Sequence, residues 1–189
     1  AALLDLGLPL GKLKPELKKI PTLKFTLKTS KKNVHAVRAS QFQVICPHRE
    51  APRSWQQVRN LLQRSKLSSS VKQTGIEIFS QLAQAEAKIH GVAVDKVHFH
   101  EVGATDSIVD IVAAAVGVEA LGIARLHFSR IPLGRGVTRS QHGPLPVPGP
   151  ATLELLKGLP TFGIDLESET VTPTGAALIN ALGSGFGDQ

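Results

Sequence analysis

The alternation of apolar and polar side chains between residues 97 and 100 predicts a short extended segment. Successive side chains of an extended chain point to opposite faces, so Val97 and Phe99 would face an apolar core. His98 and His100 would then share the other face. The pattern therefore predicts two imidazoles that converge at the end of a strand.

After Gly103 the pattern changes to apolar side chains at every third or fourth position, which indicates an amphipathic helix. The helix would begin near Thr105 or Asp106, either of which could cap its first turn, and would end at Gly122. Asp106 and Asp110 would lie on one face. That face continues through Ala113 and Gly117, small residues that allow another backbone or a ligand to come close. We expect a structural role for Asp110.

Similar patterns predict further helices and strands. Helices are expected at residues 2–6, 14–20, 54–64 with Ser54 as cap, 70–90 ended by Gly91, and 173–182, and a strand is expected at 125–133. The helix at 70–90 would bury a side that includes Glu86. His90, at its end, would neutralise the helix C-terminus or, as the alternative, bind a metal.

Residues 23–38 alternate in the manner of a β-hairpin, with a lysine-rich turn at residues 29–33. Together the patterns predict an α+β fold, in which a mixed sheet that includes this basic antiparallel hairpin is packed by several helices. A chain of 189 residues with 42% apolar residues is sufficient for one domain, residues 1–189. No apolar run reaches the length of a membrane-spanning helix, and we expect a soluble, cytoplasmic protein with no membrane partner.

The net charge of +7 is concentrated in residues 1–38, which hold nine Lys or Arg against Asp5 and Glu16. Lysines on an edge hairpin commonly keep it soluble, which is the interpretation we favour. The alternative is a surface that attracts nucleic acid or an anionic nucleotide. Because only 4% of the residues are aromatic, few rings are present to stack on bases, and no nucleic-acid partner is expected.

Two imidazoles and several carboxylates follow one another from His98 to Asp106, and they are the candidate metal site. His98, His100 and Glu101 are the proposed ligands, with Glu101 and Asp106 as candidate catalytic residues. Imidazole and carboxylate ligation suits nickel or zinc. The alternative is structural: Asp106 caps the helix and the histidines form hydrogen bonds with a neighbouring loop. Cys46, the single cysteine, is either a free thiol or a nickel ligand beside His48.

Two segments could bind an anion. Arg135, Arg139 and His142 accompany a glycine-rich stretch and offer guanidinium groups that match phosphate or carboxylate. Thr172, Thr174 and Gly175 precede or begin a helix, whose first amides could also bind an anion, although an ordinary helix cap explains this motif equally simply.

Three separated motifs give the chain a family resemblance. The run from His98 to Gly122, the segment 133–158 with its repeated prolines, and the motif 171–178 together resemble the LarC family of nickel-insertion proteins. The resemblance implies a lyase-class enzyme that inserts Ni²⁺ into pyridinium-3,5-bisthiocarboxylic acid mononucleotide, giving the nickel-pincer cofactor. The reaction would consume CTP with a divalent cation.

The resemblance also implies parts that this sequence lacks. Family members begin with a strand and a loop that precede the helix at Ala2, and they continue beyond Gln189 into a C-terminal domain associated with CTP. That domain is an expected partner, and a homo-oligomer is compatible with the sequence. The cysteine-histidine stretch at 46–49 stands where many members carry a histidine-rich tract. The fragment alone could therefore be inactive.

Two other functions stay open at this point. In a metal-dependent hydrolase, Glu101 would activate a metal-bound water. In a non-catalytic nickel chaperone or a nucleic-acid-binding module, no bond would be made or broken.

Overall fold

The computed structural model describes residues 1–47, 51, 53–100, 102–140 and 143–187. Its helices are α1 (Ala2–Asp5), α2 (Leu10–Leu17), α3 (Trp55–Arg64), α4 (Ser69–His90), α5 (Thr105–Ala120), α6 (Pro150–Leu155) and α7 (Pro173–Leu182), with a 3₁₀ turn η1 (Val94–Lys96). Its strands are β1 (Thr26–Val34), β2 (Val37–Ile45), β3 (Leu126–Phe128), β4 (Ile131–Leu133), β5 (Val137–Ser140), β6 (Gly143–Pro146), β7 (Thr161–Gly163) and β8 (Gly183–Phe186). The predicted α+β class is confirmed.

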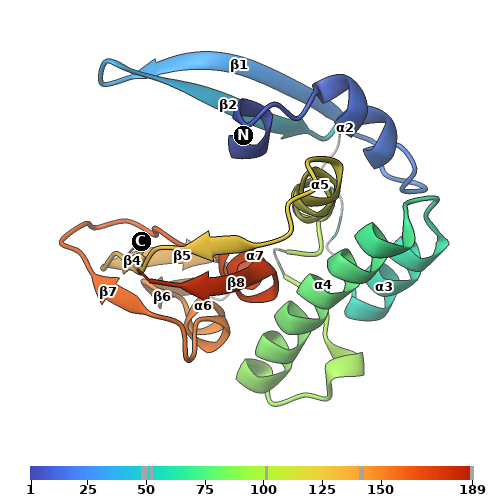
Figure 1. Ribbon diagram of the computed structural model, residues 1–189. Coiled ribbons are helices and arrows are strands. Elements are labelled where there is room, and N and C mark those ends of the chain that lie inside the picture. The colour runs from blue at the N-terminus through green and yellow to red at the C-terminus, as the bar shows by residue number, and fades with distance from the viewer. Residues whose placement is uncertain (48–50, 52, 101, 141–142, 188–189) are drawn as a thin grey trace.

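Helix α4 is the centre of the molecule and packs against α3, α5, α6 and α7 (Figure 1). Its buried face includes Phe79 and Leu82, which are almost completely excluded from solvent. A Cβ added at Gly75 would lie 3.4 Å from Leu62 of α3 and 3.9 Å from Val112 of α5, which is ordinary van der Waals contact, so both helices lie close to α4 at this position. The apolar core is therefore built around one helix.

The helix boundaries follow their local signals. Ser54 caps α3 in a capping box with Gln57, as the sequence predicts for the cap residue. Gly91 ends α4 in the left-handed region, with φ +63°, and Gly122 has the same φ just after α5. Helix α5 begins at Thr105 as expected, but its N-cap is Ala104 and no side chain caps it.

The prediction of one mixed sheet is wrong for the part of the chain that is described. The strands form four separate two-stranded sheets: β1 with β2 and β5 with β6 are antiparallel, while β3 with β8 and β4 with β7 are parallel. The predicted strand at 125–133 is divided into β3 and β4, which pair with different partners. The apolar pattern marks which residues are extended but not which strand each one pairs with.

The predicted hairpin is confirmed, but its predicted turn is wrong. Val34 pairs with Val37, so the turn consists of His35 and Ala36, and the lysine-rich stretch lies inside β1. The strands adopt this register because it pairs nine residues in each strand, more than a turn at residues 29–33 would allow. The turn end of the β1–β2 ribbon extends beyond the helices, and Figure 1 shows the ribbon along the top of the view. Nearer its middle, Lys31 and Ser40 contact Asp5 of α1.

Candidate functional site

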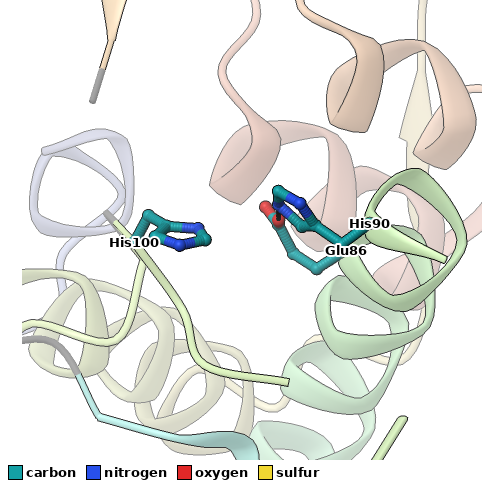
Figure 2. A group of neighbouring side chains, drawn as sticks. All are labelled: Glu86, His90 and His100. Atoms are coloured by element: carbon teal, nitrogen blue, oxygen red, sulfur yellow. Dashed lines mark ion pairs between the residues drawn. The ribbon is translucent and has the colours of Figure 1, made fainter. Parts of the chain in front are cut away.

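Three potential metal ligands meet where α4 ends. The carboxylate of Glu86 and the imidazoles of His90 and His100 each offer one ligand atom, and these atoms lie within 4.8 Å of one another. His90 Nε2 lies 3.2 Å from Glu86 Oε2, and the two imidazole ring centroids are 5.1 Å apart. Figure 2 shows the three side chains directed toward a common point.

The sequence places Glu86 and His90 on the same side of α4 because residues four apart are neighbours on a helix surface. His90 is the last residue of the helix, which Gly91 ends. The Glu86 side chain is 16% exposed and that of His90 is 32% exposed, so the pair lies in a shallow position that solvent or a substrate can reach.

His100 reaches the pair through an extended segment anchored in the core. Val97 and Phe99 are 2% exposed each, and the Phe99 ring packs on Phe79 of α4 with centroids 5.9 Å apart. His98 is exposed and His100 is partly buried, as the alternation of this segment predicts. Because Phe99 is fixed against α4, the next residue is fixed near the end of that helix.

Backbone hydrogen bonds also hold Val97, Phe99 and Gly103 against Arg53 and Trp55, at the start of α3. The Trp55 amide donates to the Val97 carbonyl at 3.1 Å, and the Phe99 amide donates to the Arg53 carbonyl at 3.2 Å. The Arg53 amide donates to the Gly103 carbonyl at 3.2 Å. A Cβ at Gly103 would lie 2.7 Å from both the amide nitrogen and the carbonyl oxygen of Arg53. Only glycine fits this approach without a shift of backbone.

The structure brings one of the predicted ligands, His100, into the three-residue group. His98 is exposed and forms an isolated bridge with Ser54, and it is not a member of the group. Asp106 is exposed, and its Oδ1 accepts from the Ser107 amide at 2.8 Å, which is a helix-start interaction. Glu101 lies outside the described residues, as does His142.

Sequence reasoning missed Glu86 and gave His90 mainly a helix-terminal role. Glu86 was expected on the buried side of α4, where it lies in part. The signal that could have found the pair is a glutamate four residues before a histidine in the last turn of a helix. Their meeting with His100 depends on the tertiary path of the segment after η1, which no local pattern contains.

The predicted anion-binding residues have interactions of their own. A guanidinium nitrogen of Arg135 lies 2.5 Å from Asp165 Oδ1, and both side chains are mostly exposed. Arg139 is exposed on β5 opposite Pro144. The Thr172 hydroxyl accepts from the Gly175 amide at 3.2 Å, so it caps α7. Thr174, in the first turn of α7, is partly buried.

Asp110 lies beside a separate pocket between α1, α2, β2 and α5. Burial, and to a smaller extent the charge of Asp106, raises the pKa of the Asp110 carboxyl above its ordinary value. The pocket has a volume of about 350 Å³ and is otherwise mainly apolar. A Cβ at Gly117 would lie 2.5 Å from Leu3, which confirms the expected close approach on this face of α5.

Two imidazole nitrogens and one carboxylate oxygen form a ligand set suited to a divalent transition metal. Ligand atoms around a bound ion lie roughly 3 to 4 Å apart, given metal–ligand bonds of about 2.0–2.2 Å. The three atoms, now within 4.8 Å, need only small side-chain movements to reach that arrangement. Three protein ligands leave coordination positions open for a substrate.

Comparison with known proteins gives one consistent result. The sequence profile of a family described as "Nickel insertion protein" matches residues 1–189. Relatives from Citrifermentans bemidjiense and from Geobacter sp. strain M21 are each 47% identical over 99% of this chain, and each match covers 49% of the relative. A relative from Dictyoglomus thermophilum is 39% identical over 96% of the chain and 47% of its own length. All three carry the same provisional name, as nickel insertion proteins.

The chain spans about half the length of these curated relatives. No solved structure matches it. Among the described residues, no helix combines the length and the apolar character that a membrane crossing requires.

Proposed function

Since this chain belongs to the nickel insertion protein family, we propose that Glu86, His90 and His100 hold the nickel ion before it is inserted. The observation that carries the proposal is the convergence of two imidazoles and a carboxylate at the end of α4. Imidazole and carboxylate ligands bind nickel but release it more readily than a closed set of thiolate ligands would.

The proposed substrate is pyridinium-3,5-bisthiocarboxylic acid mononucleotide, on which the nickel ion would become bound to two sulfur atoms. The three ligands would hold the ion while its open positions accept the first sulfur, and would then be replaced as the second sulfur binds. Consumption of CTP, with its divalent cation, is proposed for the complete protein and for the part of it that lies beyond this chain.

We further propose that Arg135, Arg139 and the Thr174–Gly175 turn contact the phosphate of the substrate. Guanidinium groups match phosphate geometry, and the start of α7 offers backbone amides. Arg135 would have to exchange its contact with Asp165 for the phosphate. Glu101 and Asp106 are also proposed as catalytic residues, on the basis of the sequence, with Asp106 as a possible further oxygen ligand of the ion.

The test is calorimetric titration of nickel into the metal-free chain and into three single variants. His90→Ala and His100→Ala should each weaken nickel binding at least tenfold, because each removes one of three ligands. His127→Ala is the matched control, since His127 is an exposed histidine on β3 outside the group.

The His98→Ala variant separates this site from the set predicted from the sequence. His98 is exposed and outside the group, so its replacement should leave nickel binding within twofold of the unaltered chain. Loss of binding in His98→Ala with retention in His90→Ala would contradict the proposed ligands and favour the set His98, His100 and Glu101.

A further inference from the structure

A second pocket lies where the β1–β2 ribbon meets the end of α2. Its volume is about 390 Å³, within the range of small-ligand sites. Lys18 and Lys24 line it together with the hydroxyl-bearing Thr26. The remaining wall is apolar and includes Leu23, Phe25 and Ile45. Two exposed lysines thus border a pocket whose other lining is largely apolar.

Both lysines lack a salt-bridge partner in the described part of the chain. The neighbouring Lys19 is paired with Glu16 at 2.5 Å, whereas Lys18 and Lys24 have no such contact among the described residues. The sequence contains no Asp or Glu between Glu16 and Glu50. The electrostatic character of the pocket is therefore positive, with no carboxylate from its own segment to neutralise it.

Protection of an edge strand does not account for these charges. That role applies to lysines within a strand, such as Lys28 and Lys32 of β1, whereas Lys24 precedes β1 and Lys18 follows α2. The turn between them also carries an unusual backbone: Thr22 has φ +67°, a left-handed conformation that is rare for a β-branched residue. This conformation sets the path by which Leu23, Lys24 and Phe25 enter the pocket wall.

The pocket is remote from the proposed nickel site. The Lys19 carbonyl accepts from the Lys66 amide at 3.1 Å, so the end of α2 lies beside the start of α4. The nickel ligands lie at the opposite end of α4, which is 22 residues and therefore roughly 33 Å long. One small molecule cannot occupy both places.

We propose that this pocket binds a nucleotide, with the phosphate between Lys18 and Lys24 and the planar ring on the apolar wall beside Phe25. Ammonium groups supply the charge that a phosphate requires, and a ring against Phe25 buries the apolar faces of both. The limited volume and the single aromatic side chain favour one nucleotide over a nucleic-acid strand. This site goes beyond the proposed nickel chemistry and does not depend on it.

The test is titration of the chain with adenosine 5′-monophosphate in low-salt buffer, by calorimetry. The double variant Lys18→Gln/Lys24→Gln should weaken binding at least tenfold. The matched control is Lys12→Gln/Lys14→Gln, which removes the same charge from exposed positions of α2 outside the pocket and should change binding less than twofold. Equal weakening in the two double variants would overturn the proposal, because only net charge would matter.

Three further probes test each part of the ligand. Adenosine, which lacks the phosphate, and ribose 5-phosphate, which lacks the ring, should each bind at least tenfold more weakly than the nucleotide. Ribose 5-phosphate binding as tightly as the nucleotide would overturn the role of Phe25. Tight binding of a 20-nucleotide single strand with no binding of the mononucleotide would overturn the proposal in favour of a nucleic-acid surface. The melting temperature of each variant confirms that these exposed substitutions leave the fold intact.

Discussion

At the scale of single residues, the candidate nickel site depends on a glycine that binds nothing itself. Gly103 lets the segment that carries His100 lie against the backbone of Arg53, where a Cβ would be 2.7 Å from two backbone atoms. Backbone atoms on both sides of this contact cannot move aside as a flexible side chain can. The position of His100 is therefore linked to the side-chain size at Gly103.

We predict that Gly103→Ala lowers the free energy of unfolding by about 1–3 kcal/mol, the usual cost of overpacking. It should also weaken nickel binding several-fold, because the segment that carries His100 is displaced. Thermal melts and nickel titration measure the two effects.

The control for this prediction is Gly11→Ala. A Cβ there meets nothing within 4 Å, and the residue lies in α2, where alanine is the better helix former. This variant should be at least as stable as the unaltered chain and should bind nickel equally. Unchanged nickel binding in Gly103→Ala would show that the glycine does not position His100.

At the scale of elements, the β1–β2 ribbon has a turn that its residues do not favour. His35 and Ala36 form the two-residue connection with φ of 45° and 66°, a conformation for which Asn-Gly is the preferred pair. From Lys28 to Ala39, every residue with a described side chain is exposed, so little packing supports the turn. The ribbon is held at its base, where Leu27 is buried, and in its middle, where Lys31 and Ser40 contact Asp5 of α1.

We predict that His35→Asn/Ala36→Gly stabilises the ribbon by about 1 kcal/mol, because both positive φ values become unstrained. Hydrogen exchange of the β1 and β2 amides should slow by about fivefold, following the relation between free energy and equilibrium constant. Exchange in α4 should not change. Faster exchange in the ribbon would mean that the turn conformation is not the one described.

The helices and strands also show which features of the fold can be predicted from the sequence alone. The cap of α3, the left-handed glycines after α4 and α5, and the burial of Val97 and Phe99 all follow from local patterns and agree with the sequence predictions. The predicted hairpin turn is wrong because a continuous polar stretch that contains Ser30 and Asn33 resembles a turn, whereas pairing along two nine-residue strands decides the register. Strand partners were beyond prediction, since short strands such as β3 and β4 carry too few residues to specify them.

The candidate site was predicted in part for the same reason. His100 follows from alternation, but Glu86 and His90 join it only because Phe99 packs on Phe79 and directs the segment past the end of α4. Such a contact between distant residues has no signature in the spacing of the sequence.

At the scale of the whole molecule, one helix connects the two halves of the chain. Helix α4 packs against α3, which precedes it in the sequence, and against α5, α6 and α7, which follow it. Lys88 of α4 also contacts Glu154 of α6 at 2.7 Å. Because both halves share the core around α4, the molecule should unfold in one cooperative transition.

We predict that Ala177→Leu lowers the free energy of unfolding by about 1–3 kcal/mol, since Ala177 in α7 is completely buried. Trp55, the single tryptophan, lies on α3 in the other half of the sequence and is 5% exposed. Its fluorescence transition should shift by the same amount as the circular dichroism transition. A shift in circular dichroism with no shift in Trp55 fluorescence would show two independent units.

The three proposed nickel ligands lie close together along the chain, all between residues 86 and 100. The entropy lost when such ligands are gathered around an ion grows only with the logarithm of the loop length, so the loss is small here even in a chain without tertiary structure. We therefore expect unfolded molecules to keep part of the affinity for nickel. An ion that binds both the folded and the unfolded chain raises the melting temperature less than its affinity for the folded chain implies.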